Sequence, residues 1–183
     1  MEKVWEKELL SGITLTSNFW TDVYKRKCLM LYNNKICEFN YKLLNNLLAS
    51  NTKLYKWKKA TTDKCRLCGS IETVSHMLYE CIHIQHIWQK ISVALNINIR
   101  YKTVILGIQQ DNIMADSLNI IISEIARLIY ISRYNGCTNL KPYITHSLEK
   151  HCMIIKNMKI QKLKIIYPSL LLFTKSLTRS LQE

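Results

Sequence analysis

Apolar residues recur at helical spacing along most of this chain. In the segment 36–48 they follow the first apolar position by three, seven, eight, eleven and twelve residues, which is typical of one buried face of an α-helix. These residues are Ile36, Phe39, Leu43, Leu44, Leu47 and Leu48. The segment is therefore predicted to be the main core helix of the first half.

Other segments show the same period. A short charged helix is predicted over residues 2–10, and a second helix begins at residue 19 with Asn18 as its cap. The run after Cys81 continues the pattern to residue 95. In residues 111–134 the apolar positions occupy more than half of the helical circumference, so this helix is expected to be central to a second bundle.

Two regions give a less regular pattern. Residues 101–107 are short and rich in β-branched side chains, which predicts a strand or an extended connector. In residues 141–183, Lys159 and Lys162 fall inside the apolar stripe, so either the helix breaks there or the lysine stems lie along the core. Pro168 indicates a kink or a helix start.

Turn-forming residues are scarce, because the 183 residues include only 4 Gly and 2 Pro. This scarcity favours helices joined by short polar loops over strands and tight turns. The predicted fold is mainly α, with two small helical bundles flanking a metal-binding loop. The expected division is 1–62 for an N-terminal helical segment, 63–95 for the metal loop with its following helix, and 96–183 for a C-terminal basic bundle.

The chain is strongly basic, with 26 Lys and Arg against 13 Asp and Glu and a formal net charge of +13. Such an excess attracts polyanions, so RNA or DNA is the expected partner and an anionic membrane surface the second possibility. The first residues lack the apolar core of a secretion signal, and no apolar run is long and uncharged enough to span a bilayer. An intracellular location is expected, in the nucleus or in a cytoplasmic ribonucleoprotein, with no membrane partner and no small-molecule substrate.

Three cysteines and a histidine fall at the spacing of metal ligands. They are Cys65, Cys68, His76 and Cys81. Two thiols three residues apart can bend a loop around one ion, and a helix-borne His and Cys five apart can complete a tetrahedron that suits zinc. Gly69 follows the second thiol, where a tight loop needs positive φ. A set in which His86 replaces His76 is also chemically possible.

A basic and aromatic stretch precedes and enters this loop. Its cations and rings are Lys53, Tyr55, Lys56, Trp57, Lys58, Lys59, Lys64 and Arg66. Phosphates pair with such cations while unpaired bases stack on the rings, so these residues are the predicted nucleic-acid surface. The alternative is that Leu54 and Trp57, three residues apart, dock the stretch into the core.

At these residues the sequence resembles a known family. The segments that carry the resemblance are FNYKLLNNLLASNTKLYKWK at 39–58, ETVSHMLYEC at 72–81, IW at 87–88, VILG at 104–107 and LNIIISEIARLIYISRYNG at 118–136. Together with the ligand spacing, they resemble the C-terminal zinc-knuckle (CCHC) region of non-LTR retrotransposon (LINE-type) reverse transcriptases, over roughly residues 18–167. The resemblance implies a nucleic-acid-binding module that follows a polymerase and helps to hold template RNA and target DNA.

The sequence lacks the residues of the enzymes to which this family is attached. A polymerase needs paired carboxylates for two metal ions, and the chain has no Asp-Asp pair. The carboxylates after Cys81 do not have the spacing of the family's restriction-like nuclease. The chain is thus expected not to be an enzyme. Two rival interpretations are a protein-interaction or folding module that docks on a reverse transcriptase, and a cryptic nuclease.

Overall fold

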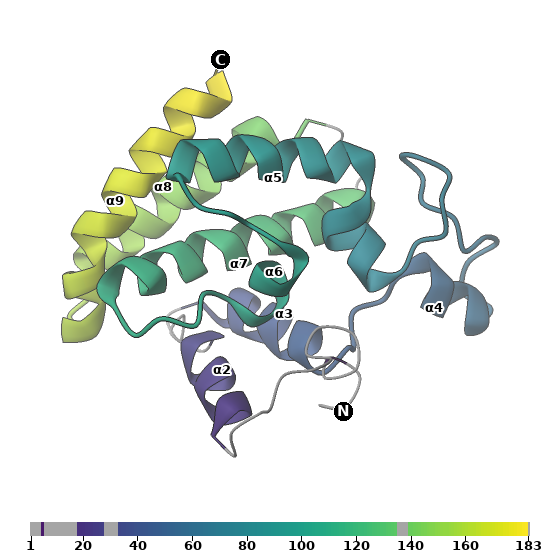
Figure 1. Cartoon of the computed structure of the whole chain (residues 1–183), viewed down its shortest axis with the longest axis horizontal. Helices are drawn as coiled ribbons and strands as arrows, with labels where there is room; N and C mark the ends of the chain where they lie inside the picture. Colours follow the sequence, from purple (N-terminus) through teal and green to yellow (C-terminus); the bar gives the residue numbers. More distant parts are fainter. Residues whose placement is uncertain (1–4, 6–17, 28–32, 135–138, 183) are drawn as a thin grey trace.

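The long helix α7, Ile113–Tyr134, lies at the centre of the molecule (Figure 1). The computed structural model describes residue 5 and residues 18–27, 33–134 and 139–182. Within these ranges the chain forms helices and no strand, so the mainly α prediction is confirmed. None of the described helices is long and apolar enough to cross a bilayer.

Most of the other described elements pack around α7 (Figure 1). In chain order they are α2 (Phe19–Lys27), α3 (Asn34–Leu44), α4 (Asn51–Lys56), the π-helical turn η2 (His76–Glu80), α5 (Ile82–Leu95), α6 (Tyr101–Leu106), α8 (Lys141–Asn157) and α9 (Gln161–Gln182). Helices α2, α3, α6, α8 and α9 and the turn η2 all contact α7. By contrast, α4 projects from the side of this helical body.

Helix α3 confirms the core helix that the apolar period predicts. Asn33 caps it, because its side-chain oxygen accepts hydrogen bonds from the backbone N–H groups of Lys35 and Ile36. Five of the six predicted core residues are buried: Ile36, Phe39, Leu43, Leu44 and Leu48. The helix ends at Leu44, and the following turn leaves Leu47 half exposed.

The region 101–107 forms helix α6, so the predicted strand or extended connector is wrong. The Thr103 hydroxyl accepts a hydrogen bond from the Arg100 backbone N–H and so supports the first turn. Gly107, at φ 79° and ψ 179°, ends the helix in a conformation suited to glycine. Val104, Ile105 and Leu106 are all buried, and this tertiary burial outweighs the strand preference of the β-branched side chains.

The C-terminal region breaks where the lysines interrupt the apolar stripe. Helix α8 ends at Asn157 and α9 begins at Gln161, which confirms the first of the two predicted alternatives. Lys159 and Lys162 are exposed. Pro168 lies inside α9.

One buried cluster joins the described elements. It runs from Trp5, through α2 and α3 and the metal loop, to Leu181 in α9. The indole Nε1 of Trp5 donates to the Leu44 carbonyl at 2.7 Å; the rest of the predicted helix 2–10 lies outside the described residues. Helices from all three predicted segments line this cluster, and the division at residues 62 and 95 stays a prediction.

Lys27 is buried, although it is one of three consecutive cations in the last turn of α2. Its side chain is 1% exposed, and its Nζ donates to the Val104 carbonyl at 3.1 Å and the Ser123 hydroxyl at 3.3 Å. Burial lowers the pKa of Lys27 to about 7. The ammonium therefore satisfies a backbone carbonyl near the C-terminal end of α6 and is not available to a ligand.

Candidate zinc centre and the neighbouring basic surface

Cys65 and Cys68 lie in a narrow loop closed by backbone hydrogen bonds. The Cys65 N–H donates to the Ser70 carbonyl at 2.7 Å, and the Gly69 N–H donates to the Cys65 carbonyl at 2.9 Å. Gly69 takes φ +77°, as the sequence predicts for this position. The loop therefore turns both thiols to the same side.

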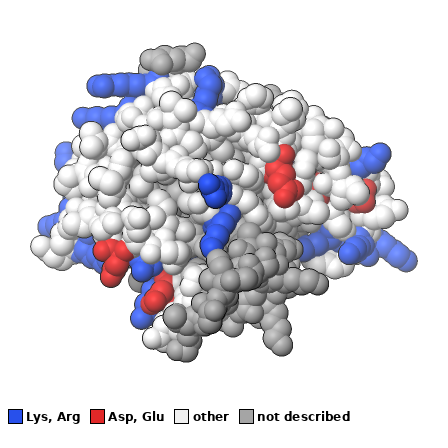
Figure 2. All heavy atoms as spheres, viewed as in Figure 1, with Lys and Arg blue, Asp and Glu red and all other residues white. Residues whose placement is uncertain are grey.

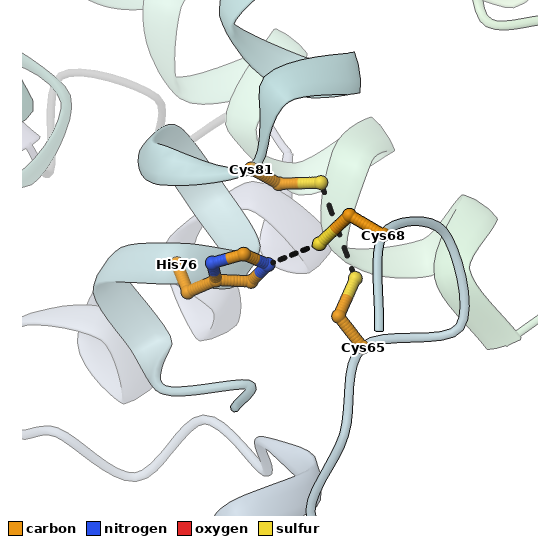
Figure 3. Close-up of side chains that lie close together, drawn as sticks. All are labelled: Cys65, Cys68, His76 and Cys81. Carbon is orange, nitrogen blue, oxygen red and sulfur yellow. Dashed lines mark hydrogen bonds between the residues drawn. The ribbon is translucent and has the colours of Figure 1, made fainter. Parts of the chain in front are cut away.

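His76 and Cys81 bound the π-helical turn η2. The Thr73 hydroxyl accepts a hydrogen bond from the His76 N–H at 3.1 Å, and the Cys81 N–H donates to the His76 carbonyl at 3.0 Å. The π turn begins at His76, and Cys81 is the residue that precedes α5, so both ligands lie at the start of a helical segment. Both side chains point to the cysteine loop (Figure 3).

The four predicted ligand atoms converge. All of them lie within 4.8 Å of one another, with Cys68 Sγ 3.2 Å from His76 Nε2 and Cys65 Sγ 4.0 Å from Cys81 Sγ (Figure 3). Tetrahedral zinc with Zn–S bonds of about 2.3 Å needs sulfurs about 3.8 Å apart. Three sulfurs and one imidazole in this arrangement fit a closed zinc site.

The alternative ligand His86 lies outside this group. Both His83 and His86 are exposed on α5, and neither belongs to the group of converging ligand atoms. The structure thus assembles the set with His76 that the spacing favours.

The thiols of the site differ in acidity before a metal binds. A hydrogen bond from the Ser70 backbone lowers the pKa of Cys68 to about 6, whereas burial raises the pKa of Cys81 to about 12. Cys68 therefore loses its proton more easily than Cys81. A bound dication supplies the charge that Cys81 needs to become a thiolate.

A buried carboxylate ties the zinc loop to two helices. Oε1 of Glu72 accepts from the Asn51 N–H at 2.8 Å, at the start of α4, and pairs with Arg133 Nη1 at 2.8 Å, near the end of α7. The second guanidinium nitrogen of Arg133 donates to the Ala49 carbonyl at 2.7 Å. Sequence reasoning missed this contact, because 61 residues separate the partners and no short motif contains both. Both guanidinium nitrogens of Arg133 are thus used inside the molecule.

The basic and aromatic stretch forms α4 and the loop after it. Tyr55 is 52% exposed and Trp57 is 56% exposed, so Trp57 does not dock into the core. The exposed cations beside them are Lys56, Lys58, Lys59, Lys64 and Arg66. Figure 2 shows Lys and Arg gathered at the edge of the molecule where α4 projects, and again over α8 and α9.

Lys53 differs from the other predicted contacts. Its ammonium donates to Asn46 Oδ1 at 2.9 Å and to the Leu48 carbonyl at 3.1 Å, and it also bonds the Asn46 carbonyl. It therefore satisfies carbonyl groups in the turn after α3. We define the α4 surface as Tyr55, Lys56, Trp57, Lys58, Lys59, Lys64 and Arg66.

A closed Cys₃His group on a helical body defines a zinc-binding protein, and the comparison with known families gives the type. Residues 1–88 match the family described as zinc-binding in reverse transcriptase. This part of the chain is thus similar to the zinc-binding region of reverse transcriptases, which confirms the resemblance within the matched residues. No curated protein and no solved structure matches the chain.

Proposed function

We propose that this protein is a zinc-stabilised module that binds single-stranded RNA or DNA through the α4 surface. The observation that carries the proposal is the exposure of Tyr55 and Trp57 among lysines on a projecting segment. Rings buried only to half their area can still accept stacked bases, and the neighbouring ammonium groups can neutralise phosphates. Contacts of this kind give affinity with little sequence preference.

The zinc ion would act here on structure and not on a reaction. Four protein ligands leave no open coordination position for an activated water. Asn51, the first residue of α4, donates through its side chain to the Lys64 carbonyl at 2.7 Å, and Thr52 donates to the Glu72 carbonyl at 2.7 Å. The zinc loop would thus hold both ends of the α4 surface. We place the module beside a reverse-transcriptase polymerase, as an accessory part without catalysis of its own.

Binding of a fluorescent single-stranded oligonucleotide tests the proposal. The double variant Lys58→Glu/Lys59→Glu should weaken binding at least tenfold and make its dependence on salt less steep, because two phosphate contacts are lost. Trp57→Ala should weaken binding while leaving the salt dependence unchanged, since it removes stacking alone.

The matched control is Lys90→Glu/Lys164→Glu, which makes the same change of charge at two exposed positions on α5 and α9. It should lower affinity far less than the α4 variant. Affinity that is independent of salt, or equal losses in the two double variants, would refute the α4 surface as the binding site.

A second candidate function is docking on a partner protein. A groove of about 510 Å³ between α8 and α9 supports it. Met153, which is 67% exposed, and Leu171 line the groove beside Lys156, Lys175 and Arg179. Capture by a reverse-transcriptase polymerase fragment that Met153→Asp abolishes, with no oligonucleotide binding at micromolar protein, would favour this candidate.

A further inference from the structure

The groove between α8 and α9 has the length of a helical segment of another protein. The two helices lie side by side (Figure 1), and α8 lines the groove with residues between 149 and 156. On α9 the lining residues lie between 167 and 179. At 1.5 Å per residue the α9 side is about 18 Å long, which equals about three turns of a helix.

The floor of the groove is apolar, because its polar side chains bond within the protein. Cys152 Sγ donates to Thr174 Oγ1 at 3.5 Å, and the Thr178 hydroxyl donates to the Thr174 carbonyl at 2.9 Å. Met153 and Leu171 add apolar side chains beside them. An unbranched thioether adapts its shape to an apolar partner, so the 67% exposed Met153 is suited to contact with one.

Exposed cations line the groove beside this apolar floor. They are Lys156, Lys175 and Arg179, and the acidic lining residue is Glu149. None of the three cations forms an ion pair with a described residue. A ligand that carries carboxylates on both sides of an apolar stripe would complement this arrangement in charge and in polarity.

A nucleic-acid strand complements the groove less well. Tyr55 and Trp57 on the α4 surface are each more than half exposed, whereas Tyr167, the aromatic residue that lines the groove, is partly buried. The groove therefore offers the bases of a strand little stacking surface. Its methyl and thioether groups also give no hydrogen bonds to the polar edges of bases.

We propose that the α8–α9 groove binds one acidic amphipathic helix of a partner protein. The apolar stripe of that helix lies against Met153 and Leu171, and its carboxylates pair with the three cations. Amphipathic helices commonly dock in this way, through apolar anchors three and four residues apart. The inference rests on the docking function named above as the second candidate. It does not rest on the α4 surface, with which the groove shares no residue.

Three synthetic peptides of about 14 residues, or about four helical turns, test the inference. Each has one side-chain bridge that holds it helical, because short helices are marginal in water. The first carries Leu at steps of three and four residues with Glu between them, the second has Lys in place of every Glu, and the third has the composition of the first without the stripe. Fluorescence anisotropy with the full-length, zinc-loaded protein should show the first peptide binding about tenfold more tightly than either of the others.

Variants of the groove should weaken binding of the first peptide. Met153→Asp should do so about tenfold, because it places a carboxylate against the apolar stripe of an acidic ligand. Lys175→Glu/Arg179→Glu should also weaken binding and make its salt dependence less steep. The matched control is Leu172→Asp, which makes the same change of charge on α9 at a position that is 65% exposed and outside the groove. It should keep the affinity of the wild type.

Three outcomes would overturn the inference. If the two acidic peptides bind equally, the protein attracts their charge and recognises no helix. If a single-stranded oligonucleotide displaces the first peptide from Lys58→Glu/Lys59→Glu as readily as from the wild type, the groove cations bind phosphates. If the peptide does not bind while Met153→Asp still abolishes capture of the polymerase fragment, the docking function holds and the acidic helix is the wrong partner.

Discussion

At the scale of single residues, the chain separates groups that hold structure from groups that can meet a ligand. Lysines with similar sequence surroundings have opposite roles: Lys27 and Lys53 donate to carbonyl groups inside the molecule, whereas Lys58 and Lys59 are exposed. The net charge of the chain therefore overstates the charge that is available to a polyanion.

Loss of a zinc ligand should unfold the metal loop. Cys68→Ser and His76→Ala each remove one of four ligands, and structural zinc contributes several kcal/mol or more to folding. Native mass spectrometry should show both variants without zinc, and circular dichroism should show reduced helix content. His86→Ala is the control and should keep one zinc per chain. Metal loss in His86→Ala together with retention in His76→Ala would identify His86 as the ligand.

The buried Lys27 makes stability depend on pH. Its pKa in the folded state is about 7, whereas in the unfolded chain it is near 10.5. Between these values the unfolded chain binds a proton that the folded protein does not, so stability increases with pH by up to about 1.4 kcal/mol per unit. Below pH 7 both states carry the charge and this dependence vanishes.

Lys27→Met lacks this titration. Denaturant unfolding at pH 7 and pH 9 should therefore show the wild type gaining about 2 kcal/mol relative to the variant over this interval. Parallel pH profiles for the two proteins would show that Lys27 stays charged in the fold.

At the scale of elements, contacts between helices decide what local patterns leave open. The side-chain amide of Asn119 in α7 makes two hydrogen bonds to the backbone of Ile108, just after α6. Its Oδ1 accepts from the Ile108 N–H at 2.7 Å, and its Nδ2 donates to the Ile108 carbonyl at 3.1 Å. We call this pair of hydrogen bonds the Asn119 clamp. Gly107 makes room for this amide. These hydrogen bonds fix the backbone of the segment between α6 and α7 against α7.

Two glycines with nearly equal φ should respond differently to alanine. A Cβ at Gly107 would lie 2.8 Å from Asn119 Oδ1, whereas a Cβ at Gly69 would have nothing within 4 Å. Each change costs of order 1–3 kcal/mol of backbone strain, and Gly107, at ψ 179°, lies in a region that is essentially restricted to glycine. Gly107→Ala should cost about 1–3 kcal/mol more, because the Asn119 clamp must shift. Thermal unfolding of both variants measures this difference; equal losses would contradict the clamp.

The same contacts explain which parts of the fold and site can be predicted. The apolar period of α3 is local and the ligand spacing is short, so both follow from the sequence. Residues Tyr101 to Leu106 favour a strand locally and become helical because the core buries them. The pair of Glu72 and Arg133 cannot be predicted from a pattern, since its members meet only after α7 has packed.

At the scale of the whole molecule, the ion pair of Glu72 and Arg133 joins the zinc loop to the central helix. Both side chains are almost completely buried, so Arg133→Met would leave a buried carboxylate without its cation. This change should cost about 3–5 kcal/mol of unfolding free energy. The control Lys42→Met breaks an exposed pair with Glu38 and should cost less than about 1 kcal/mol. Similar costs in denaturant unfolding would show that the buried pair is not important for stability.

Helix α5 has a practical consequence for fragments of this protein. The family match stops at residue 88, inside this helix, where Trp88 is buried and donates to the Leu78 carbonyl at 2.8 Å. Six residues further on, the Ala94 carbonyl accepts from Ser176 of α9. A truncation at residue 88 would therefore divide helix α5 and remove Arg133, the ion-pair partner of Glu72 in the metal loop. The unit that can be expressed alone is longer than the unit that the family alignment outlines.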